Sequence, residues 1–349
     1  MPSYDLAWHI YITNLGLSLV AITAIQKVLT LDYWKQADKL KIGDYVFDKD
    51  GKAVQVKLVQ HYYADECYEV IFDDHLTIKG DKNLGFQIQN RKYRKQLDAY
   101  KNIRPFYKKL TFTKLEQLLE VPLRCKRNRT EYSIPTTKPI EFPHQNLSIP
   151  PFILGFWLYN RNKNNLMVTI PGYEDFIFEK FRSHGYKIIE GPKRPRGKKV
   201  FRTEPAIHLQ LAPNIPSRIP TNYLFASVEQ RIELLTGIIH AKSAQYEKKN
   251  DRFRFTSFNL NVVTQIQQLV ESLGAKTSIF FNPPRNTYTV FFKFRIKIMD
   301  IQTSPPVKVY PGRRYIKAIK PTQPQMCVHI ETTGADNSIL VGEGFIQTC

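Results

Sequence analysis

Two short stretches of the sequence alternate basic and aromatic side chains in a way that suits phosphate binding. Residues 252–254 read Arg-Phe-Arg, and residues 291–295 read Phe-Phe-Lys-Phe-Arg. Successive side chains of a β-strand point to opposite faces, so we expect the cations on one face and the aromatic rings on the other. The cationic face could then meet phosphates, whereas the bland alternative is an ordinary sheet with a solvated basic face. The candidate binding residues here are Arg252, Arg254, Lys293 and Arg295.

Three further basic runs lie at residues 90–95, 124–129 and 191–199. The last is too rich in Pro and Gly for regular structure and predicts a loop. Such runs usually mark solvated loops, but beside a nucleic-acid-binding fold we favour phosphate contact. The candidate residues of the last run are Lys193, Arg194, Arg196, Lys198 and Lys199.

The composition favours a polyanionic partner. The 349 residues carry 51 Lys and Arg against 31 Asp and Glu, a net charge of +20, together with 22 Phe and 19 Tyr. Excess positive charge with many aromatic rings indicates nucleic acid, with DNA favoured over RNA. A larger protein or nucleoprotein complex is a further candidate partner.

The cysteines and the hydropathy pattern exclude several classes of protein. The four cysteines form no CxxC pair and no His/Cys cluster, so neither a metal site nor a disulfide framework is predicted. An intracellular, reducing compartment is expected. The apolar run at residues 10–25 is interrupted by polar residues, falls short of about 18 uninterrupted apolar residues and lacks a basic region before it. We therefore expect no signal peptide and no membrane partner.

Two apolar stretches, each centred on one glycine, predict a pair of closely packed helices. Residues 228–242 place apolar side chains at i, i+3 and i+4 around Gly237, and residues 152–160 have the same character around Gly155. Glycine inside a helix costs about 1 kcal/mol relative to alanine. Its presence makes sense where another backbone must come very close.

These helices resemble the paired helices of the LAGLIDADG homing endonucleases, which pack against each other through small residues. After the second helix come a strand at residues 252–257 and a helix at 262–273, closed by Gly274. The first copy is looser, with a strand at 166–170 and a helix at 173–183. The resemblance implies a pseudo-two-fold αββαββα domain. The alternative is two buried amphipathic helices in an unrelated protein.

Both ends of the chain resemble the Hint splicing domain of inteins. Residues 40–46 read Leu-Lys-Ile-Gly-Asp-Tyr-Val and precede an Asp-Gly turn, and residues 328–331 and 336–346 resemble the last two intein blocks. Short β-branched runs punctuated by Gly and Asp are typical of a compact all-β domain. The two helices lie between these segments, which is the order of an intein with an embedded homing endonuclease.

The resemblance therefore implies an α+β protein, with an all-β Hint-like domain formed from both chain ends and an inserted αββαββα domain. We expect an N-terminal extension or host-protein remnant at residues 1–20 and the first part of the Hint-like domain at 21–100. A basic linking segment is expected at 101–145 and the endonuclease-like domain at 146–320. Residues 321–349 would complete the Hint-like domain.

The splicing positions that the resemblance implies are substituted. The first intein residue supplies a thiol or hydroxyl for the acyl shift, but Ala21 stands there, as in some inteins that let a downstream nucleophile attack directly. The histidine that polarises the scissile peptide falls at Leu84, which cannot donate or accept a proton. His75 could substitute, although a surface histidine is favoured. Asn337 stands at a later histidine position, and Cys349 stands at the penultimate place with no asparagine after it to cyclise. We expect splicing to be abolished.

The nuclease positions are substituted as well. In LAGLIDADG enzymes each helix ends in an acidic residue, and the two carboxylates hold divalent metal at the scissile phosphates. Here the two positions are Asn160 and Lys242. Asparagine is a weak neutral ligand, and lysine would repel the ion but suit a phosphate. We expect no cofactor, although Mg²⁺ serves active members of the family, and no cleavage.

The favoured hypothesis is an intein-derived, nucleic-acid-binding protein that has lost both chemistries. The alternatives are an active or partly active intein and homing endonuclease, or a domesticated structural subunit of a larger nucleoprotein assembly. Family resemblance alone implies a DNA endonuclease with autocatalytic protein splicing. The substituted positions argue against enzymatic activity without deciding it.

Overall fold

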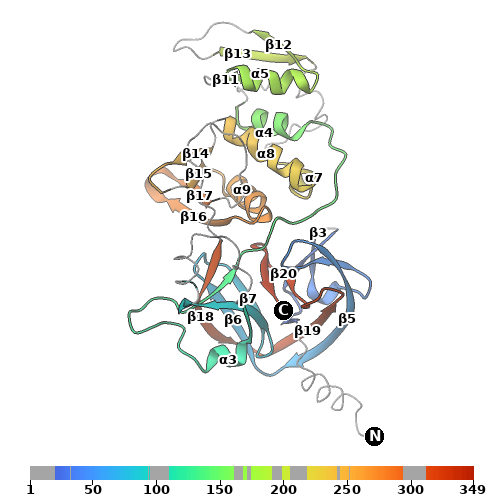
Figure 1. Ribbon diagram of the computed structural model, residues 1–349, viewed down its shortest axis with the longest axis vertical. Helices are drawn as coiled ribbons and strands as arrows, with labels where there is room; N and C mark the ends of the chain where they lie inside the picture. The colour runs from blue at the N-terminus through green and yellow to red at the C-terminus, as the bar shows by residue number, and fades with distance from the viewer. Residues whose placement is uncertain are drawn as a thin grey trace. The chain divides into compact units, whose positions relative to one another are not determined.

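The chain divides into two compact units, and the first is built from both chain ends (Figure 1). The β unit comprises Met1–Thr137 with Arg313–Cys349, and the inserted unit comprises Lys138–Gly312. The computed structural model describes residues 20–31, 33–92, 94, 110–160, 168–170, 174–190, 199–204, 218–241, 244–250, 252–293 and 312–349. The predicted α+β class, with an α+β domain inserted into a β domain, is confirmed.

The β unit is one extended antiparallel sheet system that folds around a single core. Its strand order is β21-β20-β2-β4-β5-β19-β1-β7-β6-β18-β10-β8-β9, and β3 pairs with β2. The strands before the insertion are β1 (Val20–Thr23), β2 (Lys27–Thr30), β3 (Tyr33–Gln36), β4 (Tyr45–Phe47), β5 (Ala53–Ala64), β6 (Cys67–Phe72), β7 (Thr77–Asp81), β8 (Gly85–Asn90), β9 (Thr111–Lys114) and β10 (Tyr132–Pro135). The strands after it are β18 (Arg313–Thr322), β19 (Gln325–Thr332), β20 (Ile339–Val341) and β21 (Ile346–Thr348).

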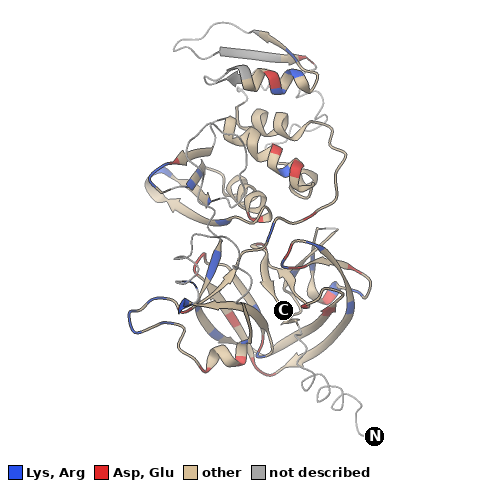
Figure 2. Ribbon diagram, in the orientation of Figure 1, with Lys and Arg blue, Asp and Glu red and all other residues tan. Residues whose placement is uncertain are grey.

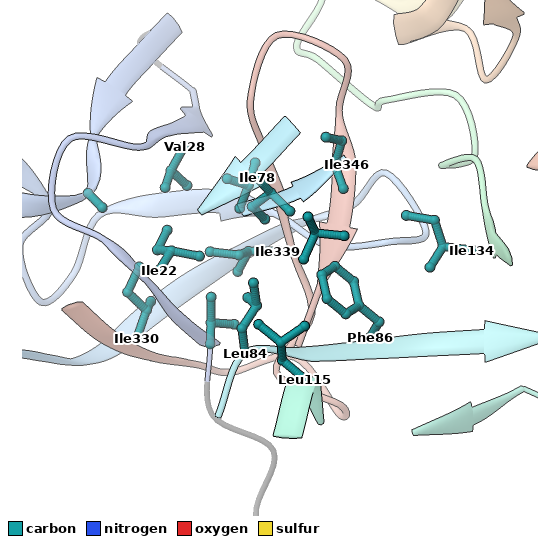
Figure 3. Packing of buried hydrophobic residues seen from close by; sticks show 14 of the residues in the cluster. Ile22, Val28, Ile78, Leu84, Phe86, Leu115, Ile134, Ile330, Ile339 and Ile346 are labelled. Atoms are coloured by element: carbon teal, nitrogen blue, oxygen red, sulfur yellow. The ribbon is translucent and has the colours of Figure 1, made fainter. Parts of the chain in front are cut away.

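Segments from the two chain ends alternate in this sheet, which is why neither end can form the unit alone. Strand β19 lies between β1 and β5, and β18 lies between β6 and β10. Their apolar side chains meet in one cluster, where Ile22, Leu84, Ile330 and Ile346 are almost completely buried (Figure 3). Burial of such side chains, at about 25 cal/mol per Å² of apolar surface, holds the two ends together.

Residues 110–135 of the predicted linking segment at residues 101–145 are an integral part of the β unit. Strand β10 forms the neighbour of both β8 and β18, and a short helix, α3 (Leu115–Leu119), follows β9. Leu115, Leu118 and Ile134 are buried in the core of the β unit. The many charged residues between these few apolar positions concealed the elements.

The inserted unit carries two α/β halves. The second half runs α8 (Val228–His240), β14 (Ala244–Glu247), β15 (Arg252–Ser257), α9 (Leu260–Ser272), β16 (Lys276–Asn282) and β17 (Thr287–Lys293), which is the expected helix-strand-strand order repeated. The first half contains α4 (Pro151–Asn160), β11 (Val168–Ile170), α5 (Glu174–Ser183), β12 (Lys187–Glu190) and β13 (Lys199–Glu204), and a short α7 (Thr221–Leu224) precedes α8. The strand orders of the sheets are β11-β13-β12 and β14-β15-β17-β16.

Local signals fix the helix ends in the second half. Ser227 caps α8 by accepting a hydrogen bond from the backbone N–H of Gln230, and the Gln230 side-chain Oε1 accepts one from the Ser227 N–H. Asn259 caps α9, and Gly274 follows that helix with φ +85°. Such caps satisfy backbone groups that a helix end leaves open.

The inserted unit begins and ends earlier than the expected range of 146–320. Ile140 hydrogen-bonds through its backbone to Ser272 and to the buried Arg231 of α8, so residues before the first helix already pack in this unit. At the other end, β18 is part of the β unit's sheet. Residues 1–19 of the expected extension, with most of the apolar run at 10–25, lie outside the described residues. No described helix is long and apolar enough to cross a membrane.

Candidate functional site

Two glycines bring α4 and α8 into direct backbone contact. A Cβ on Gly155 would collide with the carbonyl oxygen of Leu234, and one on Gly237 would collide with the carbonyl oxygen of Phe152. The two contacts are reciprocal, because each helix offers a glycine to the other helix's backbone (Figure 1). The close helix pair predicted from the sequence is therefore present.

The ends of these helices carry the two predicted nuclease positions. Asn160 is the last residue of α4 and is half-buried. Helix α8 ends at His240, and Lys242 lies outside the described residues. The His240 ring packs 5.0 Å from the ring of Phe176, and burial, then the nearby charge of Lys180, lowers the pKa of His240. In the described part of the chain, no three His, Cys, Asp or Glu residues form a group that could hold a metal ion.

The sheet β14-β15-β17-β16 has one apolar face and one cationic face. Phe255, Val290 and Phe292 are almost fully buried on the face that packs against α9. The strand register places Arg254 beside Phe291, and Lys276 beside Lys293, on the opposite face. We call this second surface the open face. The alternation predicted for residues 252–255 is present, whereas Arg295 lies outside the described residues.

The open face differs from the prediction because it also carries aromatic rings, those of Phe291 and of Phe280, which is 58% exposed. The guanidinium of Arg252 stacks 3.8 Å from the centre of the Phe291 ring. Phe291 has this position because odd-numbered residues of β17 share the face of Lys293. A cation over an aromatic ring is stabilised by the ring's electron density, so Arg252 is held in place rather than left mobile.

One carboxylate partly neutralises the open face. Glu247 of β14 accepts a hydrogen bond from Arg252 Nε at 2.7 Å and lies 3.6 Å from Arg254 Nη1. The hydrogen bond from Arg252 lowers the pKa of Glu247, so it is ionised at neutral pH. Arg254 also donates to Gln245 Oε1 at 2.8 Å. The arginines are therefore positioned by neighbours on the same face before any ligand binds.

The basic loop predicted at residues 191–199 is largely beyond the described residues. Lys193, Arg194, Arg196 and Lys198 belong to that part of the chain, and Lys199 is the first residue of β13. Their expected phosphate contact stays a prediction.

Three of the predicted splicing positions meet at the turn between β7 and β8. A Cβ on Gly80 would collide with the Ala21 carbonyl oxygen and would lie 3.0 Å from Leu84 Cδ2. A Cβ on Gly85 would collide with the Cys349 carbonyl oxygen. The glycines at both ends of the turn thus let the backbones of β1 and of the C-terminal strand approach it. Sequence analysis missed Gly80 and Gly85, although a glycine on each side of Leu84 was the available signal.

This convergence is apolar rather than reactive. Ala21 and Leu84 are fully buried, and Cys349 is 2% exposed. Burial raises the pKa of the Cys349 thiol to about 12, so it is protonated at neutral pH. Thr348 donates its hydroxyl to the Gly85 carbonyl oxygen at 2.8 Å. The geometry brings the strands together without a free nucleophile or a proton acceptor among these side chains.

Asn337 and His75 serve turns. Asn337 has φ +50° and accepts a hydrogen bond from the Thr332 N–H through Oδ1 at 3.1 Å. His75 has φ +69° in the turn between β6 and β7, where its N–H donates to the Phe72 carbonyl oxygen. Asparagine tolerates this left-handed backbone region better than most residues.

A buried polar group beside Ala21 escaped the sequence analysis. His329 of β19 is the register partner of Ala21, and its ring lies 4.2 Å from that of Tyr62. Tyr62 donates to Asp81 Oδ2 at 2.8 Å, and burial raises the pKa of Tyr62. The signal that could have found His329 was its place in an alternating strand, opposite the first predicted splicing position.

Comparisons with known proteins return a curated relative and several similar solved structures. No protein-family model matches the chain. Among curated proteins, the replicative DNA helicase DnaB of Mycobacterium intracellulare is 23% identical over 361 residues, covering 95% of this chain. The match covers 59% of that relative, so the chain spans about three fifths of its length.

Solved structures similar to the chain include inteins and a homing endonuclease. The MchDnaB-1 intein is 24% identical, covering 20% of this chain and 54% of that one, with a TM-score of 0.19. I-DmoI in complex with its target DNA is 14% identical, covering 45% of this chain and 97% of that one, with a TM-score of 0.30.

Proposed function

We propose that this chain is an intein-derived protein of the homing-endonuclease type that binds nucleic acid, DNA in preference to RNA, and has lost both splicing and cleavage. The open face carries the proposal. It presents Arg252, Arg254, Lys276 and Lys293 from neighbouring strands, with one carboxylate among them. A β-ribbon with such a face suits the groove and phosphates of a duplex.

Neutral hydrogen-bonding groups on the same face support a nucleic-acid ligand over a simple anion. Thr256 and Thr289 are register partners whose hydroxyls lie 2.8 Å apart, and Ser278 and Asn282 belong to the same face of β16. Cations position a protein on phosphates, and neutral polar side chains can contact base edges. The bland alternative, a solvated basic face, predicts only weak association.

Loss of cleavage follows from the residues at the helix ends. Divalent metal in active relatives of this type needs two carboxylates, but Asn160 is neutral and a lysine stands at position 242. These residues do not fit Mg²⁺, so the chain is expected to leave DNA intact. We expect loss of splicing because Leu84 stands where the chemistry needs a proton carrier. Ala21 supplies no nucleophile of its own, so only direct attack by a downstream nucleophile would be open to the chain.

Binding is tested by titrating the full chain against a short mixed-sequence DNA duplex and a structured RNA over a salt series. A steep decrease of affinity with salt is expected, with a slope of about −0.9 per neutralised phosphate for duplex DNA. The Arg254→Gln/Lys293→Gln variant should lower the slope by about 2. Lys57→Gln/Lys317→Gln, which removes two exposed cations of the β unit, is the matched control. Equal slopes for both variants would refute the assignment of binding to the open face.

The loss of splicing is tested by expressing the chain between two reporter domains and separating the products by gel electrophoresis. Only the full-length fusion is expected. A ligated reporter pair would establish the alternative, an active intein. For cleavage, incubation of the protein with Mg²⁺ and a duplex library should give no metal-dependent products.

A further inference from the structure

The β unit carries a rigid, strongly basic hairpin that lies outside both substituted sites. Its arms pair at Arg124 and Thr130, and the Cys125 N–H donates to the Arg129 carbonyl oxygen at 2.9 Å. The turn closes where the Asn128 N–H donates to the Cys125 carbonyl oxygen at 2.8 Å, and Asn128 has φ +53°. We call residues 124–130 the basic hairpin; Figure 2 shows Lys and Arg along this loop between α3 and β10.

Two arginines anchor the basic hairpin to the β unit. Arg94 is 5% exposed and donates to the carbonyl oxygens of Thr130 at 2.8 Å and Glu131 at 2.7 Å. Arg91 donates from Nη1 to Cys125 Sγ at 3.1 Å. The hairpin is therefore ordered before any partner arrives, which reduces the entropy lost on binding.

The cations at the tip are not neutralised by neighbours. Arg124, Lys126, Arg127 and Arg129 are all exposed, and the structure shows no ion pair for any of them within the residues it describes. On the open face, by contrast, Glu247 lies within ion-pair distance of two arginines. The basic hairpin is thus a denser source of unpaired positive charge than the open face.

We propose that the basic hairpin is a second binding surface for nucleic-acid phosphates, carried by the β unit and separate from the open face. The choice of nucleic acid as the polyanion rests on the proposed function. Three of the four exposed cations are arginines, whose planar forks match phosphate geometry. Residues 124–130 contain no aliphatic or aromatic side chain, which disfavours a protein partner because protein interfaces normally have an apolar core.

The first test compares salt slopes for duplex DNA in the full chain. The Lys126→Gln/Arg127→Gln/Arg129→Gln variant should lower the slope by about 3, because each lost phosphate contact removes about one unit. Among the described residues these tip side chains make no hydrogen bond that holds the hairpin, so the fold should persist. The matched control is Lys57→Gln/Lys317→Gln/Lys320→Gln, three exposed lysines elsewhere in the β unit, which should leave the slope nearly unchanged.

The outcomes separate this inference from the proposed function. If the open-face variant lowers the slope and the hairpin variant behaves like the control, the hairpin proposal is wrong and the open face stands. If only the hairpin variant lowers it, the hairpin proposal stands and the open face loses its role. Undetectable binding to duplex DNA and RNA at low salt, with capture of an acidic protein instead, would overturn both.

A second measurement uses Cys125 as a local reporter. Cys67, Cys327 and Cys349 are buried, whereas Cys125 is half-exposed, so a maleimide should label Cys125 first in the folded chain. Duplex DNA at saturating concentration should slow this labelling at least severalfold, and the hairpin variant should lose that protection. Labelling that duplex DNA leaves unchanged, under conditions where binding is otherwise seen, would overturn the proposal.

Discussion

The positions that the resemblances assign to splicing and to the nuclease lie in physically different surroundings. At the turn between β7 and β8, Ala21, Leu84 and Cys349 are sealed inside the β unit. At the end of α4, Asn160 remains polar and half-buried. The first set of positions belongs to an apolar core, whereas Asn160 is a polar residue at a partly exposed position. Restoring chemistry should therefore cost much stability at the first site and little at the second.

The largest expected loss of stability lies in the pair of helices α4 and α8. Their close approach depends on Gly155 and Gly237 and not on the residues at the helix ends. Gly237→Leu should destabilise the inserted unit by several kcal/mol, about 3 or more, because even its Cβ collides with the Phe152 carbonyl oxygen. Leu235→Ala, which leaves a cavity at a fully buried position, should cost about 2–5 kcal/mol and serves as the comparison. Urea unfolding measures both. A loss for Gly237→Leu well below that of Leu235→Ala would refute the packed pair.

A histidine at the buried position 84 should lower the free energy of unfolding substantially. Leu84→His introduces a polar ring at a fully buried position of the β-unit core and should cost about 2–4 kcal/mol without restoring splicing. Leu119→His is the matched control, because Leu119 is 42% exposed and should change stability by less than about 0.5 kcal/mol. Similar losses in urea unfolding for the two variants would contradict the contrast between a sealed and an open site.

Acidic residues at positions 160 and 242 should change the free energy of unfolding little and should create a metal-binding site. Asn160→Asp is expected to shift stability by less than about 0.5 kcal/mol, because the position is partly exposed. Combined with Lys242→Asp it should create Mn²⁺ binding detectable by paramagnetic resonance, which the unmodified chain should lack. Metal-dependent cutting of DNA by the unmodified chain would show that positions 160 and 242 were wrongly assigned to the acids.

The reactivity of two cysteines, Cys125 and Cys349, should depend on pH in different ways because one is partly exposed and the other is buried. Backbone hydrogen bonds from Arg127 and Arg129 lower the pKa of Cys125, whereas burial raises that of Cys349 to about 12. The thiolate is the reactive form, so alkylation of Cys125 should rise with pH through a midpoint below that of an ordinary cysteine. Cys349 should remain unlabelled at neutral pH in the folded chain. Mass spectrometry of the peptides that contain Cys125 and Cys349 measures the two alkylation rates. Equal rates would contradict this prediction.

Elements with a strong local sequence pattern were predictable from the sequence. The helices around Gly155 and Gly237 and the alternation at residues 252–255 follow from residue type and spacing alone. The prediction of a linking segment failed because Leu115, Leu118 and Ile134 are too few, among charged residues, to produce a recognisable hydrophobic periodicity. The contacts of Arg252 with Glu247 and Phe291 were not predictable. They depend on the register between neighbouring strands, which a single stretch of sequence does not encode. The turn between β7 and β8 required three distant segments to meet.

The pairing of β10 with β18 explains how a second folded unit can be accommodated within the β unit. Pro135 is the register partner of Arg313, so the chain leaves the β unit and re-enters it at adjacent points of one antiparallel ladder. These strands have the geometry of a hairpin whose turn has been replaced by an entire folded unit. Residues 138–312 therefore lie between two paired strands, and exchanging them for a short turn would leave every strand of this ladder in the chain.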